Sequence, residues 1–157
     1  MVLTFLVASL LVAISVASII ICREQKIPES ISAFVWLLKY KWFWTLWIWC
    51  IAITLGIPVI EILPDPLKAI GFLMISSLGF VGAMPLFEEE LRTAHNFLGI
   101  VAGILSQICV LIINPWWLLV WVGAISLLIL PNRYAVLISE ILCSISIYGC
   151  LFTSFLL

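Results

Sequence analysis

A long stretch without formal charge constrains this chain more than any other feature. From Thr93 to Asn132 there is no Asp, Glu, Lys or Arg, and this run is too long for a single bilayer crossing, which needs about 20 residues. Over the whole chain 66% of residues are apolar and 10% are charged, whereas a soluble domain carries charge on about a quarter of its residues. So few charges cannot cover a surface that faces water. We therefore predict an integral membrane protein whose first partner is the lipid bilayer.

The apolar runs predict an all-α fold, a polytopic bundle of six transmembrane helices in one domain over 1–157. Spanning β-strands would be short segments of alternating polarity, but these runs are long and apolar on every side. Helices are then the remaining way to satisfy backbone hydrogen bonds in lipid. Asn114 and Pro115 divide the long uncharged run, because Asn suits a helix cap and Pro suits the first helical turn. The predicted spans cover about 2–22, 42–60, 69–87, 93–113, 115–130 and 134–157.

The distribution of Lys and Arg predicts the orientation of the chain. Loops one, three and five hold every basic residue except Lys68. Because basic loops stay in the cytoplasm, we expect these three loops to be cytoplasmic and both termini to lie outside. Val2–Cys22 has no basic residue before its apolar run and no small-residue cleavage site after it. We interpret it as a retained first helix and not as a signal peptide.

Aromatic residues gather around the start of the second predicted span. They are Trp36, Tyr40, Trp42, Trp44 and Trp47. Trp and Tyr concentrate at the headgroup level of a bilayer, where lysines such as Lys39 and Lys41 reach lipid phosphates. We interpret the group as an interfacial aromatic belt beside a short interfacial helix over 30–40, which Ser30 or Ser32 could cap. A packing face for another subunit is the alternative interpretation.

Glu140 is the one charged residue that lies inside a predicted span and away from its ends. Ionisable groups within the bilayer are expensive and are often functional. Ser144 follows at i+4 on the same helix face. Two interpretations stand side by side: a group that binds a proton or a cation, and a protonated carboxyl that bonds a neighbouring helix.

The fourth predicted span begins close to the only histidine of the chain. One face of this helix carries, at intervals of four residues, His95, Gly99, Gly103 and Gln107, and Asn96 lies beside it. The two glycines form a GxxxG pair, which lets another helix approach closely. A packing seam is the favoured interpretation of this face. The sharper one is a polar track that leads protons or a small ligand from the cytoplasmic side.

Small residues also mark the third predicted span, which contains Gly79 and Gly82. A short loop joins spans three and four, so the two helices should be neighbours. We therefore expect their small-residue faces to pack together.

The motifs predict no catalytic residue, no metal site and no cofactor. The five cysteines lie in or beside apolar runs without a CxxC pair, so small buried hydrophobes are the simplest interpretation. A single histidine cannot build a metal hydrolase site, and a net charge of −1 offers no footprint for nucleic acid. His95 and one carboxylate of 88–90 could form an acid–base couple, but nothing in their spacing is specific.

Three short segments carry a resemblance to a known group of proteins. They are Ile27–Ser32, Gly82–Pro85 and His95–Gly99. Together they resemble small six-span membrane proteins of unassigned function that are encoded by gut bacteria and their phages. The resemblance implies a protein of a bacterial cytoplasmic membrane. It implies no activity.

Three functional hypotheses follow from these features. The first is a channel- or transporter-like protein that moves protons, small ions or a small solute past Glu140 and the face from His95 to Gln107, alone or as a homo-oligomer. The second is an interaction or scaffold protein that binds another membrane protein, for example a phage-exclusion or accessory subunit. The third is an enzyme on a lipid-soluble substrate. Transport predicts polar residues on one cavity, interaction predicts dry polar contacts, and an enzyme predicts His95 near a carboxylate.

Overall fold

The computed structural model describes residues 2–25, 27–86, 92–122 and 134–156. Within these ranges the chain forms helices and no strand, which confirms the all-α prediction. Five helices are long and apolar enough to cross a membrane. The long helices are α1 (Val2–Glu24), α3 (Lys41–Ile62), α4 (Lys68–Ala83), α5 (Arg92–Ile113) and α7 (Ala135–Leu156).

Short helical turns connect the long helices. They are α2 (Phe34–Leu37), η1 (Asp65–Leu67), η2 (Met84–Leu86) and η4 (Pro115–Leu119). The fifth predicted span, 115–130, begins with η4 and one further helical turn to Val122, and the rest of it lies outside the described residues. Asn114 caps η4 as expected, since its side chain accepts a hydrogen bond from the Trp116 backbone N–H at 3.3 Å. The sixth span therefore stays a prediction.

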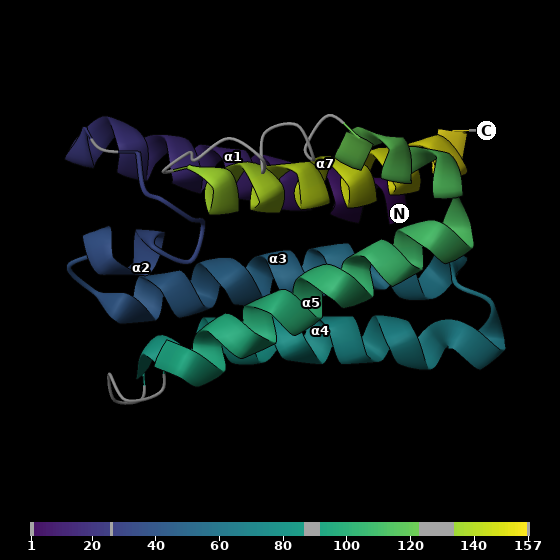
Figure 1. The fold of residues 1–157 in the computed structure, drawn as a ribbon, viewed down its shortest axis with the longest axis horizontal. Coiled ribbons are helices and arrows are strands. Elements are labelled where there is room, and N and C mark those ends of the chain that lie inside the picture. The colour runs from purple at the N-terminus through teal and green to yellow at the C-terminus, as the bar shows by residue number, and fades with distance from the viewer. Residues whose placement is uncertain (1, 26, 87–91, 123–133, 157) are drawn as a thin grey trace.

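The helices lie in two groups, α1 with α7 and α3 with α4 and α5 (Figure 1). On one side α4 packs against both α3 and α5, and on the other side α1 and α7 lie next to each other. The two groups are joined where α1 packs on α3 and where α7 packs on α5. This arrangement leaves the inward faces of α1, α3, α5 and α7 around a common interior.

Two core clusters fix the direction of each helix. One cluster joins the beginning of α1 to the last turns of α3, α5 and α7, through residues such as Leu6, Val59, Val110 and Leu151. The other joins the end of α1 to α2, the start of α3 and the end of α4. Consequently α5 and α7 run in the same direction, and the N- and C-termini lie at the same end of the bundle (Figure 1).

The glycines pack differently from the expected seam between the third and fourth spans. A Cβ on Gly82 would come within 3.0 Å of Ile48 Cβ and Trp49 Cδ1, so this glycine permits close approach of α4 to α3. The Gly79 carbonyl also faces α3, because it accepts a hydrogen bond from Trp49 Nε1 at 2.9 Å. A Cβ on Gly99 would meet nothing within 4 Å, and one on Gly103 would meet only Cys143 Sγ at 3.9 Å. Helices α4 and α5 are neighbours, but their glycines do not face each other across the contact.

The aromatic group at the start of α3 divides between surface and core. Trp36, Tyr40 and Trp42 are exposed, and the Lys41 ammonium lies 4.9 Å from the centre of the Trp36 ring. This pattern is typical of an aromatic belt. Trp44 and Trp47, in contrast, are only 1% and 5% exposed and belong to the second core cluster. They point inward because residues three apart on a helix share a face, and that face meets α2 and α4.

Candidate functional site

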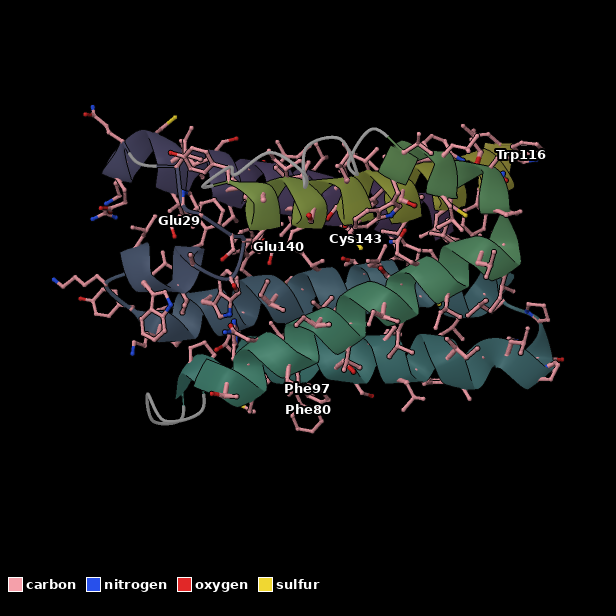
Figure 2. All side chains as sticks on the ribbon, in the orientation of Figure 1. Glu29, Phe80, Phe97, Trp116, Glu140 and Cys143 are labelled. Carbon is pink, nitrogen blue, oxygen red and sulfur yellow. The ribbon has the colours of Figure 1, made fainter. Side chains whose placement is uncertain are left out.

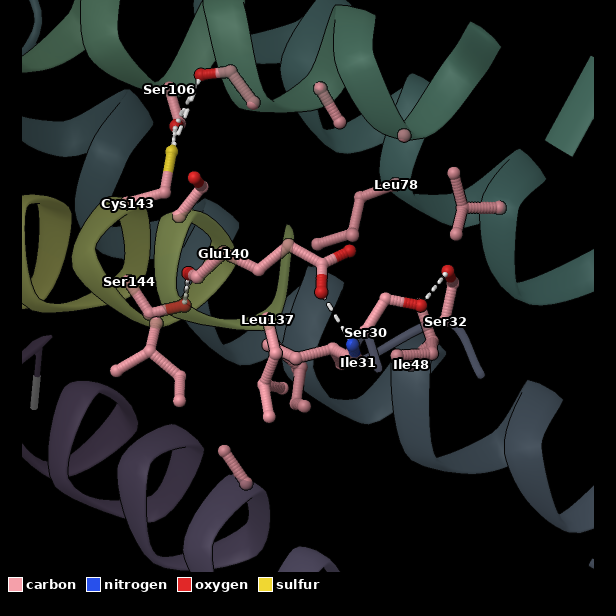
Figure 3. Close-up of a pocket in the computed structure, with 18 of the residues that line it drawn as sticks. Ser30, Ile31, Ser32, Ile48, Leu78, Ser106, Leu137, Glu140, Cys143 and Ser144 are labelled. Carbon is pink, nitrogen blue, oxygen red and sulfur yellow. Dashed lines mark hydrogen bonds between the residues drawn. The ribbon is translucent and has the colours of Figure 1, made fainter. Parts of the chain in front are cut away.

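A large cavity occupies the space between the two groups of helices (Figure 3). Its volume is about 1750 Å³, and its walls come from α1, α3, α4, α5, η4, α7 and the segment 27–36. Most of the lining side chains are apolar. The polar residues that the sequence singled out, on two different helices, all line it: His95, Asn96, Gln107, Glu140 and Ser144. The structure thus brings together the candidates of the fourth and sixth predicted spans.

Glu140 lies on the inward face of α7 and holds the segment before α2 in place. Its carboxylate accepts a hydrogen bond from the backbone N–H of Ile31 and is also oriented toward the backbone of Ser32 (Figure 3). One turn earlier, the Leu137 backbone N–H donates to the Glu29 carbonyl at 3.1 Å. A carboxylate that accepts backbone N–H bonds is partly compensated for burial. Glu140 therefore both lines the cavity and anchors the chain between α1 and α2.

Gln107 centres a polar cluster that joins α5 to α7. Its amide nitrogen donates to Cys143 Sγ at 2.9 Å and to Ser106 Oγ at 3.1 Å. Its amide oxygen accepts from Trp121 Nε1 at 2.7 Å. Ser106 and Cys143 are themselves 3.3 Å apart (Figure 3). This cluster satisfies the polar atoms of Gln107 and leaves the wall around it apolar.

The sequence did not identify Cys143 and Trp121 as parts of the site. Cys143 was interpreted with the other cysteines as a small buried hydrophobe, and Trp121 lies in an apolar run. The available signal was spacing, because Cys143 is at i+3 from Glu140 and so shares its inward face. Figure 2 shows the Glu140 and Cys143 side chains on the side of α7 that faces the opposite group of helices.

Ser144 and Asn96 contribute less than the sequence suggested. Ser144 Oγ donates to the Glu140 backbone carbonyl of its own helix at 2.9 Å, a bond that any exposed helical serine can make. Asn96 is an exposed residue at the margin of the cavity. Neither side chain is positioned as the centre of a polar site.

His95 lies at the opposite wall from Glu140, near the start of α5. Its side chain is only 9% exposed, yet neither ring nitrogen has a hydrogen-bond partner among the described residues. The Val81 carbonyl interacts with the ring. This oxygen can accept two hydrogen bonds and also faces Trp44 Nε1 at 3.5 Å. The carboxylates at 88–90 that the sequence paired with His95 lie outside the described residues. His95 is therefore a buried polar group whose polar neighbour among the described residues is the Val81 carbonyl.

Trp47 also has a buried polar atom. Its indole nitrogen is buried and has no hydrogen-bond partner in the part of the chain that the structure describes. Trp47 and His95 both line the cavity, and Trp44 lies between them. The sequence placed Trp47 in the interfacial belt, so its role in the cavity wall was missed.

No group of three His, Cys, Asp or Glu that could hold a metal ion occurs within the described ranges. Comparison with known proteins finds no matching family model, no matching curated protein and no matching solved structure. The assignment of the chain therefore rests on its own features. These are five helices long and apolar enough to cross a bilayer, as in an integral membrane protein with several spans.

Proposed function

We propose that this protein is a transporter-like membrane protein that takes a small amphipathic solute into the cavity and moves it past Glu140, Gln107 and His95. One observation carries the proposal: polar residues from separate helices line a single cavity between two groups of helices. Transporters commonly place their sites near the bilayer midplane, between elements that can move against each other.

The walls favour an amphipathic solute over an ion or a proton. An ion needs a continuous set of oxygen ligands or water along its path, whereas most of this lining is apolar. Gln107 is bonded to its neighbours, and Glu140 is bonded to backbone. The cavity also exceeds the roughly 300–1,000 Å³ of pockets for drug-sized ligands. A solute with a sizeable apolar part fits these walls best.

The directions of the helices support six spans. A chain whose two ends lie on the same side of a bilayer crosses it an even number of times. Five helices suited to crossing are described, and both termini lie at one end of the bundle. A return crossing over 115–130 completes the even number.

The charges support the proposed orientation. Arg23, Lys39 and Lys41 lie at one end of the bundle, while Lys68 at the other end pairs with Asp65 at 2.6 Å. We place the first end in the cytoplasm and the termini outside. A bacterial cytoplasmic membrane, the location that the resemblance implies, is part of the same proposal.

Access to Cys143 tests the proposal. In a variant that keeps only Cys143, reconstituted in nanodiscs, we expect a small uncharged methanethiosulfonate to modify this thiol, because the proposed cavity admits a small amphipathic solute. The matched control keeps only Cys150, which lies on the same helix but is fully buried outside the cavity. Cys143 should react at least about tenfold faster. Equal protection of both thiols would contradict a cavity open to solute.

Exposed aromatic residues favour the second candidate, an interaction protein. Trp36, Tyr40 and Trp42 form an exposed surface at the start of α3, and aromatic residues are common at protein interfaces. The same labelling experiment separates the two functions. A protected Cys143 together with a stable complex on this surface would favour interaction over transport.

A further inference from the structure

One end of the cavity carries an exposed lysine beside an exposed tryptophan. Lys41 and Trp36 both line the cavity there, and the Lys41 ammonium lies 4.9 Å from the centre of the Trp36 ring. Both side chains are exposed, so a molecule in the cavity can reach them. We call this pair the basic end. It lies at the end of the bundle that we place in the cytoplasm.

Lys41 supplies the positive charge of the described wall. The other charged side chains of this wall are the carboxylates Glu29 and Glu140, and Glu140 accepts the backbone N–H of Ile31. Among the described residues Lys41 forms no ion pair. A lysine beside a tryptophan at the membrane interface is a typical partner of lipid phosphate. The basic end therefore suits the phosphate of a lipid headgroup.

Beyond the basic end, the wall consists of apolar side chains that protein atoms do not cover. Ile100 and Ile104 of α5 and Val136 and Ile145 of α7 line the cavity and are 47–62% exposed. A Cβ on Gly99, in the same wall, would meet nothing within 4 Å. Water gains little in an apolar cavity, whereas a hydrocarbon chain covers such side chains well.

The length of this wall fits an acyl chain. On α5 the lining residues extend from Asn96 to Leu111, a distance of about 22 Å along a helix. The hydrocarbon region of one leaflet is about 15 Å thick, half of the bilayer core. Gln107, which lies on this stretch, is bonded to Trp121 and Cys143. An extended chain can therefore follow the wall without separating the Gln107 amide from its partners.

We infer that the cavity binds a phospholipid of the cytoplasmic leaflet, with the phosphate at Lys41 and Trp36 and one acyl chain along α5 and α7. The inference is carried by the basic end and the uncovered apolar wall, which belong to one cavity. It rests on the proposed function only in that the cavity admits a molecule from outside. It adds the chemical class of that molecule and the residues that meet its two parts.

Two photoreactive probes test the phosphate and the chain separately. One is a phosphatidylglycerol with a diazirine near the end of an acyl chain, and the other is the diacylglycerol with the same chains. In dodecyl maltoside micelles, whose detergent has no phosphate, we expect the phospholipid to label wall residues such as Ile104 and Ile145 in a saturable way. The diacylglycerol should label them about fivefold less, the value of one lysine beside lipid phosphate. Phe72 and Phe80, which are exposed on α4 outside the cavity, should be labelled equally by both probes.

Two pairs of variants identify the residues that bind the lipid. Lys41→Gln removes the ammonium and should lower phospholipid labelling of the wall about fivefold, to the level of the diacylglycerol. Lys39→Gln is the control, because Lys39 is also exposed at this end but lies outside the cavity wall. Gly99→Phe places a ring in the path of the chain and should lower wall labelling by both probes. Gly79→Phe also enters open space, but outside the cavity, and should leave wall labelling unchanged.

The outcomes separate this inference from the proposed function. If Cys143 reacts as proposed but the wall is labelled no more than Phe80, the cavity admits a solute that is not a phospholipid, and the inference is overturned. Equal wall labelling by both probes, or unchanged labelling in Lys41→Gln, likewise overturns recognition of the phosphate. If Cys143 is unreactive and the wall is not labelled, both proposals fail.

Discussion

At the scale of single residues, Glu140 lines the cavity and also forms a hydrogen bond that holds the fold together. Its carboxylate accepts the backbone N–H of Ile31 and so ties α7 to the segment before α2. The sequence left two interpretations open, a proton- or cation-binding group and a carboxyl bonded to a neighbouring element. The structure provides the bond, although to loop backbone and not to a neighbouring helix. A role in transport stays a prediction.

This bond makes a prediction about stability. Glu140→Ala should lower the free energy of unfolding by about 1.5–3 kcal/mol, the usual value of a hydrogen bond to a charged group. Glu140→Gln keeps an acceptor oxygen and should retain most of that stability. Reversible unfolding by SDS in mixed micelles measures both.

Ser144→Ala on the same face of α7 is the control for Glu140. Its hydroxyl bonds only within its own helix, so the change should be about 0.5 kcal/mol or less. Equal stability of the Ala and Gln variants at position 140 would mean that the carboxylate does not anchor the segment before α2.

Residue types explain which parts of the site could be predicted. Glu140, His95 and Gln107 could be found because polar side chains stand out within apolar runs. Trp47 and Cys143 were missed, since their residue types alone do not mark them: tryptophan also suits a membrane interface, and cysteine also suits any apolar contact. The sequence cannot distinguish these environments without the direction in which each side chain points.

At the scale of helices, the long apolar runs carry enough information to predict where helices form. The structure has a helix within each of five predicted spans, as in α3 over the predicted 42–60. It was harder to predict which face of each helix turns toward its neighbours, because helices that are apolar on every side have no marked inward stripe. For this reason the glycines of α4 were assigned to the α5 contact, whereas Gly82 faces α3.

The contact between α3 and α4 makes a second prediction. Gly82→Ala should destabilise the protein by about 1–3 kcal/mol, because the new methyl group would press on Ile48 Cβ, close to the backbone of α3. Gly79→Ala is the matched control on the same helix, since its methyl group would enter open space. SDS titration compares the two variants. Similar curves for both would argue against close packing at Gly82.

At the scale of the whole molecule, we propose an even number of crossings around a cavity between two groups of helices. The five described helices and the shared end of the termini support a sixth crossing. A five-span protein would place its termini on opposite sides of the membrane. The location of the two ends therefore decides between these topologies.

Reporter fusions in a bacterial host test the topology. We expect alkaline phosphatase to be active when fused after the C-terminus, because this end lies outside, and green fluorescent protein to be dark when it is exported there unfolded by the same route. A phosphatase fusion at Lys39, on the basic side, should be inactive. A tag on the N-terminus should be reached by externally added protease. An active fusion at Lys39 together with an inactive one at the C-terminus would reverse the orientation, and termini on opposite sides would exclude six spans.

We propose that His95, Gln107 and Glu140 line one solute-binding cavity inside the membrane. An experimental structure from lipidic mesophase or nanodiscs, at a resolution that reveals ordered water and bound small molecules, tests it most directly. We expect all three side chains on one cavity, with density for a solute or water between α5 and α7. An interior filled by protein side chains, with His95, Gln107 and Glu140 apart in dry contacts, would contradict the proposal.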